Sequence, residues 1–148
     1  MDKLALQPGK PVTLDLDDYL VTAQREYRDG GLTWTEWLLE DAGRGAQVWL
    51  MRHEEALALG GDLPPPCGDD LSAAPGTMDL AGKALRLVAS GRAHLAEQTE
   101  EKTRFDRVDY ALYAGADGGL VSVVKDQGGL HCRGGAALDR ARIEAYST

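Results

Sequence analysis

The chain has 148 residues, which is enough for one domain of common size with a substantial core. Its 24 acidic and 16 basic side chains give a formal net charge of −8. This charge disfavours a nucleic-acid or anionic-membrane surface, because both need clustered lysine and arginine. The acidic excess is confined to residues 1–74, with 14 acids and 6 bases, whereas residues 75–148 hold 10 of each. We interpret it as a solvated acidic surface, with a patch for a basic partner as the alternative.

The cysteine content and the N-terminal segment bear on location. MDKLALQPGK lacks the pattern of a secretion signal, and no stretch approaches the roughly 18 apolar residues of a membrane span. Cys67 and Cys132 are fewer cysteines than a secreted fold of this size usually carries. We therefore predict a cytoplasmic protein with free thiols and no direct membrane insertion, although the sequence leaves open whether the two cysteines pair. Abundant arginine beside scarce lysine and no asparagine is typical of a high-GC bacterial genome.

Alternating apolar residues bounded by glycine and proline predict a succession of strands. In chain order the predicted strands are 11–16, 19–27, 32–41, 46–52, 83–89, 104–114, 119–125 and 129–133. Five Gly-Gly doublets, which begin at residues 30, 60, 118, 128 and 134, are predicted to supply the positive φ angles of tight hairpin turns. Strands about a dozen residues apart predict a mainly β fold, either a small barrel or a sandwich.

Four segments have a less clear secondary-structure signal. RHEEALALGG (52–61) and AHLAEQTEEKTR (93–104) are rich in helix formers. For 93–104 we predict strand, because the internal repeat described next matches it to the strand and turn at 20–31. The tail 134–148 holds either one short helix or a closing strand. The segment DLPPPCGDDLSAAPG (62–76) is predicted to be a surface linker without regular structure.

The two halves of the chain resemble one another. At a constant offset of 73, residues 8–16 fall on 81–89 and residues 32–52 fall on 105–125, so that apolar residues match apolar ones and Glu36 matches Asp109. We predict a single domain, 1–148, built from two pseudo-symmetric β halves, 1–61 and 77–148, that arose by duplication and are joined by 62–76. The alternative is that the halves match without a duplication, because any two β segments share apolar alternation and glycine turns.

The stretch TWTEWLLEDAGRGAQVWL (33–50) holds all three tryptophans of the chain. Alternation puts Trp34 and Glu36 on one face and Trp37 on the other, which predicts a strand buried on both sides or a β-bulge near Trp37. The tryptophans are either core residues or, if Trp34 faces solvent, part of a binding platform. Glu36 either points to water or is held by a buried donor such as an arginine, and Asp109 raises the same question.

Sequence motifs give no support for a metal, a cofactor or a catalytic residue. His131 and Cys132 are adjacent, so on a strand they point to opposite faces, and no further ligands follow at zinc spacing. The acidic runs 15–18 and 69–70 lack the glycine and terminal glutamate of a calcium loop. No nucleophile elbow, Walker loop or dinucleotide fingerprint is present. An enzyme is therefore the less favoured class, although spatially assembled sites leave no such trace.

A set of residues resembles the bacterial domain of unknown function family 4178. The pattern is carried by Tyr19, Val21, Trp34, Glu36, Trp37, Leu38, Leu39, Gly43, Gly45, Trp49 and Leu50, and by DYALYAGADGGLVSV at 109–123. The resemblance brings no activity and no catalytic residue. Members of that family tend to be encoded beside phage-shock-type membrane-stress proteins, small membrane proteins and polyamine-synthase-like enzymes. The resemblance therefore implies an accessory or adaptor role.

We thus predict an accessory module that binds a protein partner, or a scaffold, in an envelope-stress system. The candidate surface is Trp34, Glu36 and Trp49, with second-half counterparts Arg107, Asp109 and Ser122. The alternative is a small-molecule sensor, for example of a polyamine, or a minor enzyme, with a pocket between the halves where Glu36 and Asp109 face one another. A third hypothesis is a homodimer or larger homo-oligomer formed through strand edges.

Overall fold

The computed structural model describes residues 6–41, 43–66, 70–80 and 82–145. Eleven strands form one antiparallel sheet in the order β11-β1-β2-β3-β4-β5-β10-β9-β8-β7-β6. The strands are β1 (Pro11–Leu14), β2 (Asp17–Asp29), β3 (Leu32–Asp41), β4 (Gln47–His53), β5 (Ala56–Leu63), β6 (Thr77–Leu80), β7 (Lys83–Thr99), β8 (Thr103–Gly115), β9 (Leu120–Asp126), β10 (Gly129–Ala137) and β11 (Ile143–Ala145). Among the residues described, no helix has the length and apolar character of a membrane span.

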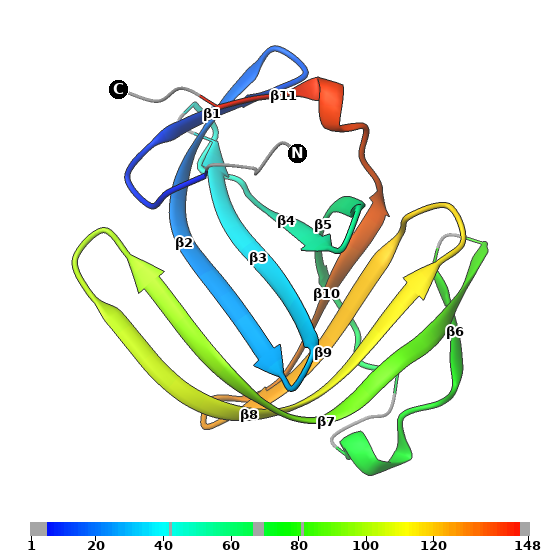
Figure 1. Cartoon of the computed structure of the whole chain (residues 1–148). Helices are drawn as coiled ribbons and strands as arrows, with labels where there is room; N and C mark the ends of the chain where they lie inside the picture. Colours follow the sequence, from blue (N-terminus) through cyan, green and yellow to red (C-terminus); the bar gives the residue numbers. More distant parts are fainter. Residues whose placement is uncertain (1–5, 42, 67–69, 81, 146–148) are drawn as a thin grey trace.

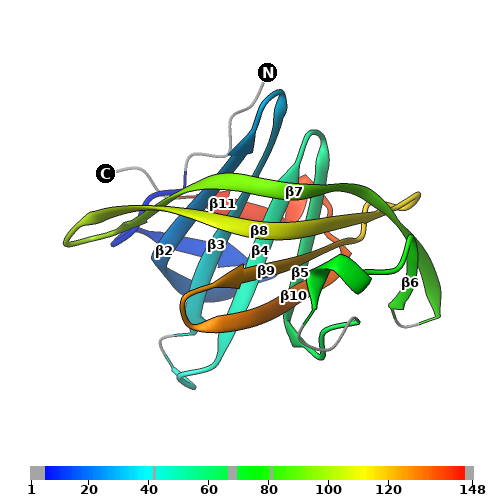
Figure 2. The same ribbon diagram turned by 90° about the horizontal axis from the view of Figure 1, so that it is seen from below.

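The sheet closes into a barrel because one edge of β2 pairs with β3 and the other edge pairs with two different strands (Figure 1). Its first part pairs with β1, and its second part, Ala23–Arg28, pairs with β7. The barrel therefore runs β2-β3-β4-β5-β10-β9-β8-β7 and back to β2. Figure 2 shows the long β7–β8 hairpin crossing the direction of β3 and β4, as tilted strands on opposite walls of a barrel do. The predicted mainly β fold is confirmed, and of its two forms it is the small barrel.

The segments with an ambiguous sequence signal form mainly strands and short turns. Residues 52–61 and 93–104 both lie in strand hairpins, so the strand prediction for 93–104 is confirmed. The tail forms a single 3₁₀ turn, Arg140–Arg142, and then the closing strand β11, which pairs with β1. The prediction for 62–76 was too broad, since Leu63 still pairs in β5 and Leu71–Ala73 forms a 3₁₀ turn. Cys67 lies outside the described residues.

The sheet buries apolar residues on both faces. The barrel interior packs Tyr27, Trp34, Leu95, Val108, Tyr110, Leu112 and Val124. On the outer face of the first half, Trp37, Leu39 and Leu50 are covered by residues of β1, β11 and the segment before β11. The outer face of the second half is covered in the same way by β6 and the 3₁₀ turn after β5. Strand β3 is thus buried on both sides, as one of the two predictions for it states, and the β-bulge lies in the neighbouring β2, after Val21.

Both halves are five-stranded antiparallel meanders with the same strand order. β1 and β6 are 66 residues apart, and so are the β-bulges that follow Val21 in β2 and Leu87 in β7. β4 and β9 are 73 residues apart. The predicted constant offset of 73 is therefore wrong for β1 and β2, where the offset is 66 because the β7–β8 hairpin is longer than the β2–β3 hairpin. It is also wrong for β3, where Leu39 corresponds to Tyr113 at an offset of 74. Residues 8–16 correspond to 74–82 rather than 81–89, and a gene duplication stays a prediction.

Two of the five Gly-Gly doublets are not turns. Gly60 and Gly61 in β5 pair directly with Gly135 and Gly134 in β10, at the seam where the two halves meet. A Cβ on Gly60 would lie 1.8 Å from the carbonyl oxygen of Gly134, and a Cβ on Gly135 would lie 1.9 Å from that of Leu59. The prediction that these doublets form hairpin turns was wrong, since they serve instead to let two strands approach where a side chain has no room.

We expect Gly60→Ala to lower the free energy of unfolding by about 3 kcal/mol, because the added methyl group forces the seam apart. The matched control is Gly61→Ala on the next residue of the same strand, where nothing lies within 4 Å of the added Cβ. Urea denaturation of both variants checks the prediction. Equal midpoints for the two variants would show that the seam is not tightly packed.

Candidate functional site

Glu36 is the centre of the barrel interior. It lies in the middle of β3 and is fully buried. A carboxylate in this position is costly unless every oxygen lone pair has a partner. The surrounding side chains meet this requirement.

Four donors from four strands surround the Glu36 carboxylate. Tyr27 Oη in β2 and Arg133 Nη1 in β10 donate to Oε1 at 3.2 Å and 3.1 Å. Trp34 Nε1 in β3 donates to Oε2 at 3.1 Å, and the Ser122 hydroxyl in β9 donates to the same oxygen. Burial, followed by the neighbouring Glu36 carboxylate, raises the pKa of Tyr27 well above its usual value, so the phenol remains a neutral donor. Of the two alternatives, a Glu36 held by a buried arginine is confirmed.

Aromatic rings enclose this carboxylate. Tyr27 and Trp34 stack with centroids 4.4 Å apart and planes inclined by 6°, and Tyr110 packs at 4.9 Å on the other side of Trp34. The guanidinium of Arg133 lies over the ring of Trp49 at 3.9 Å. The Glu36–Arg133 pair is therefore screened from water, which strengthens the attraction and also makes either partner costly to leave alone.

A second ion-pair group lies next to the first. Arg25 is the register partner of Glu36, and its Nε lies 3.3 Å from Glu97 while its Nη2 lies 3.7 Å from Asp126. Asp126 also accepts from the Gly128 N–H at 2.7 Å and contacts His131 Nε2 at 3.2 Å. Burial alone would raise the pKa of Asp126, but Gly128, His131 and Arg25 together lower it below its usual value.

The predicted site residues do not form a surface. Trp34, Glu36 and Trp49 all face the barrel interior, with exposed fractions of 2%, 0% and 8%. The hypothesis of a solvent-facing platform built from them is therefore wrong, and the core alternative for the tryptophans holds. Ser122, the counterpart of Trp49, does lie in the interior and contacts Glu36.

The predicted pairing of Glu36 with Asp109 is also wrong. Glu36 pairs with Met51, the residue 73 positions after Met51 is Val124, and Val124 pairs with Tyr110. Tyr110 therefore occupies the position of Glu36 in the second half. Asp109 lies one residue earlier, on the outer face, where it forms an exposed ion pair with Arg92. A cleft with two facing carboxylates does not exist.

Sequence reasoning missed Tyr27, Arg25 and Arg133. The alternation Arg25-Tyr27 on β2 places both on one face and is a signal that could have been used. Arg133, between Cys132 and Gly134, gives no comparable signal, because its partner Glu36 is 97 residues away. Within the described part of the chain, no group of three His, Cys, Asp or Glu side chains is arranged to hold a metal ion.

The fold and this site define a class: a small closed antiparallel β-barrel of two five-stranded meanders around a buried carboxylate–guanidinium pair. The family model described as Domain of unknown function (DUF4178) matches residues 7–140. The chain belongs to this family, as the resemblance predicted. Neither the curated proteins nor the solved structures contain a match to it.

We expect Arg133→Met to lower the free energy of unfolding by about 3–5 kcal/mol, because it leaves the Glu36 carboxylate buried without its cation. Arg92→Met is the matched control: it breaks the exposed pair with Asp109 and should cost less than about 1 kcal/mol. The double variant Glu36→Gln/Arg133→Met should be more stable than Arg133→Met alone, because a neutral amide needs no counter-charge. Chemical denaturation measures all three, and a double variant no more stable than Arg133→Met would contradict the assignment.

Asp126→Asn is expected to destabilise the protein more at pH 7 than at low pH. The folded pKa of Asp126 is depressed. Its contribution to the free energy of unfolding is therefore fully present above the unfolded pKa of about 3.9. This contribution is lost as the pH falls through the lower folded pKa. The difference between Asp126→Asn and the parent protein in urea should shrink as the pH falls below the unfolded value of about 3.9. A difference of the same size at pH 7 and pH 3 would rule out this linkage.

Proposed function

We propose that the chain is a binding module without catalytic activity of its own, and that an acidic protein segment docks on the open edge of β8. The absence of catalytic activity is supported by the hydrogen bonds of Glu36. Its two oxygens already accept four hydrogen bonds from side chains, so no lone pair is left to take a proton from a substrate. Function is therefore assigned to the surface rather than to the barrel interior.

The β7–β8 hairpin supports the second part. β8 pairs with β9 only over Asp109–Ala114, so Thr103–Val108 has β7 on one side and, within the described residues, no strand on the other. The N–H of Arg107 donates instead to the side chain of Asp106, which shows that this N–H points away from β7. An open edge of six residues is long enough for an extended peptide to add as another strand.

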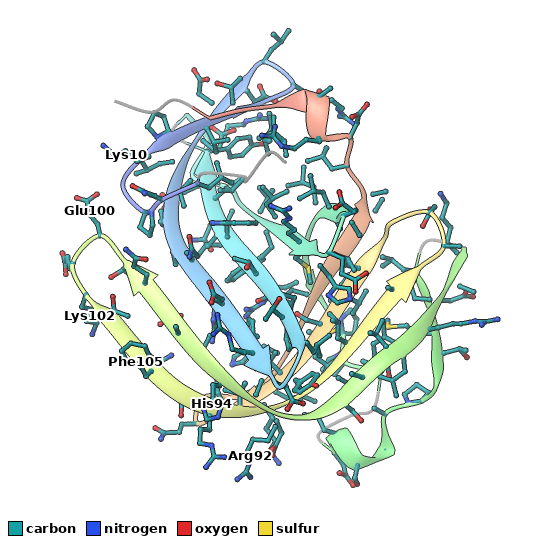
Figure 3. The ribbon with its side chains drawn as sticks, in the orientation of Figure 1. Lys10, Arg92, His94, Glu100, Lys102 and Phe105 are labelled. Atoms are coloured by element: carbon teal, nitrogen blue, oxygen red, sulfur yellow. The ribbon has the colours of Figure 1, made fainter. Side chains whose placement is uncertain are left out.

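The side chains beside this edge support the choice of an acidic partner with an apolar residue. Phe105 is 78% exposed on the outer face of β8. Arg28, His94 and Arg107 are register partners across β2, β7 and β8, and they form a basic row next to it. Figure 3 shows Lys102, Phe105, His94 and Arg92 along the outer side of the hairpin.

Only part of this positive charge is balanced locally. Arg28 pairs with Glu26 and Arg92 pairs with Asp109. The side chains of His94, Lys102 and Arg107 form no ion pair with any other described residue. On the outer face this is a short row of basic side chains beside one large apolar side chain, within a hairpin that also carries Glu97, Glu100, Glu101 and Asp106. It complements an acidic segment that carries an apolar residue.

The proposed partner-binding role agrees with the accessory role that the family resemblance implies, but it uses a different surface from Trp34, Glu36 and Trp49. A cytoplasmic location and a link to envelope stress belong to the same proposal. They rest on composition and on the resemblance.

Selection from a random peptide library on the immobilised protein tests the proposal. We expect the enriched peptides to combine Asp or Glu with an aromatic or aliphatic residue. Phe105→Ser should abolish the enrichment, and Arg107→Pro should do the same because it removes an outward N–H and a cation. Leu16→Ser is the control, since Leu16 is 95% exposed in the β1–β2 turn and should leave the selection unchanged. Enrichment without acidic residues, or enrichment that survives both hairpin variants, would refute the proposal.

A further inference from the structure

A pocket of about 270 Å³ lies at the seam between the two halves. Its walls come from β4 and β5 of the first half and from β10 of the second, and they include Trp49, Asp62, Leu63, Leu130 and Arg133. This pocket is separate from the β8 edge and shares no residue with the proposed docking surface. Its size suits a ligand smaller than a typical drug molecule.

Arg133 lines this pocket, and one of its buried donors has no partner. Its side chain is more than nine-tenths buried, its Nη1 donates to Glu36, and its plane is held over Trp49. Its Nε is buried without any hydrogen-bond partner. Nε and Nη2 form the edge of a guanidinium that binds a carboxylate through two parallel hydrogen bonds. Leaving a buried Nε without an acceptor costs free energy, which a bound carboxylate would recover.

Asp62 supplies the opposite charge in the same pocket. It is the direct register partner of Arg133 across the β5–β10 seam, and it is exposed. Asp62 makes no ion pair or hydrogen bond within the described residues, so the two opposite charges line one pocket without neutralising each other. Leu63 and Leu130 add apolar surface beside them.

We infer that the seam pocket binds a small zwitterion, a free amino acid. Its carboxylate binds the Nε and Nη2 edge of Arg133, its ammonium group binds Asp62, and its side chain contacts Leu63 and Leu130. A carboxylate alone would be repelled by Asp62, and a polyamine would bring no acceptor for the unpaired Nε of Arg133. Only a ligand that carries both charges complements both residues.

Titration with L-leucine, N-acetyl-L-leucine and L-leucinamide tests this inference. Binding is measured by calorimetry and by the shifts of the amide and indole NMR signals. We expect leucine to bind in the millimolar range or tighter and to shift the Trp49 indole signal. The two analogues, which each lack one charge, should bind at least about tenfold more weakly. Asp62→Asn changes an exposed residue and should keep the fold, but it should remove the advantage of leucine over N-acetyl-leucine.

Several results would overturn the inference. They are equal binding of the three compounds, unchanged discrimination in Asp62→Asn, and no saturable binding of leucine or any other standard amino acid at about 10 mM. Asp62→Asn should leave the peptide selection on the β8 edge unaffected. Failure of one proposal is therefore distinguishable from failure of the other.

Discussion

The structure depends on one buried carboxylate that must be satisfied from both halves of the chain. Tyr27 and Trp34 reach Glu36 from the first half, and Ser122 and Arg133 reach it from the second. Side-chain packing and the close approach at Gly60 and Gly135 already oppose a slide of one meander against the other. The carboxylate with its four directed partners opposes it further, because a shift of one residue would leave a buried charge unpaired. We infer that this polar centre helps to fix the register in which the two halves close.

The glycine seam makes that geometry possible. At Gly60 and Gly135 no Cβ fits between β5 and β10, and a Cβ on Gly134 would meet Leu120 and Val121 of β9. Arg133 directly precedes Gly134 and reaches the interior beside Trp49, while Asp62, its register partner, is exposed. The close backbone packing at these glycines and the seam pocket are therefore neighbouring features of the β5–β10 pairing.

Much of the fold could be predicted from the sequence, but the site could not. Alternation and glycine turns gave most of the strands, because these signals are local. The repeat was harder, since its offset changes where the β7–β8 hairpin is longer. An error of one residue was enough to equate Glu36 with Asp109 rather than Tyr110 and so to put an outer residue inside. Arg133 could not be found by any local rule, because closure of the barrel alone brings it to Glu36. Ser122 was named through the repeat as the counterpart of Trp49, but its contact with Glu36 could not be predicted.

The longer hairpin also separates the roles of the two halves. β3 extends beyond β4 only at Leu32–Trp34, whereas β8 extends beyond β9 at Thr103–Val108. The second half therefore has an open edge that the first half nearly lacks, and the exposed Phe105 lies on it. Extra residues that only repeated the fold would be expected to bury apolar surface. These residues instead leave Phe105 exposed beside an unpaired strand edge, which favours a role in binding for the place where the two halves differ most.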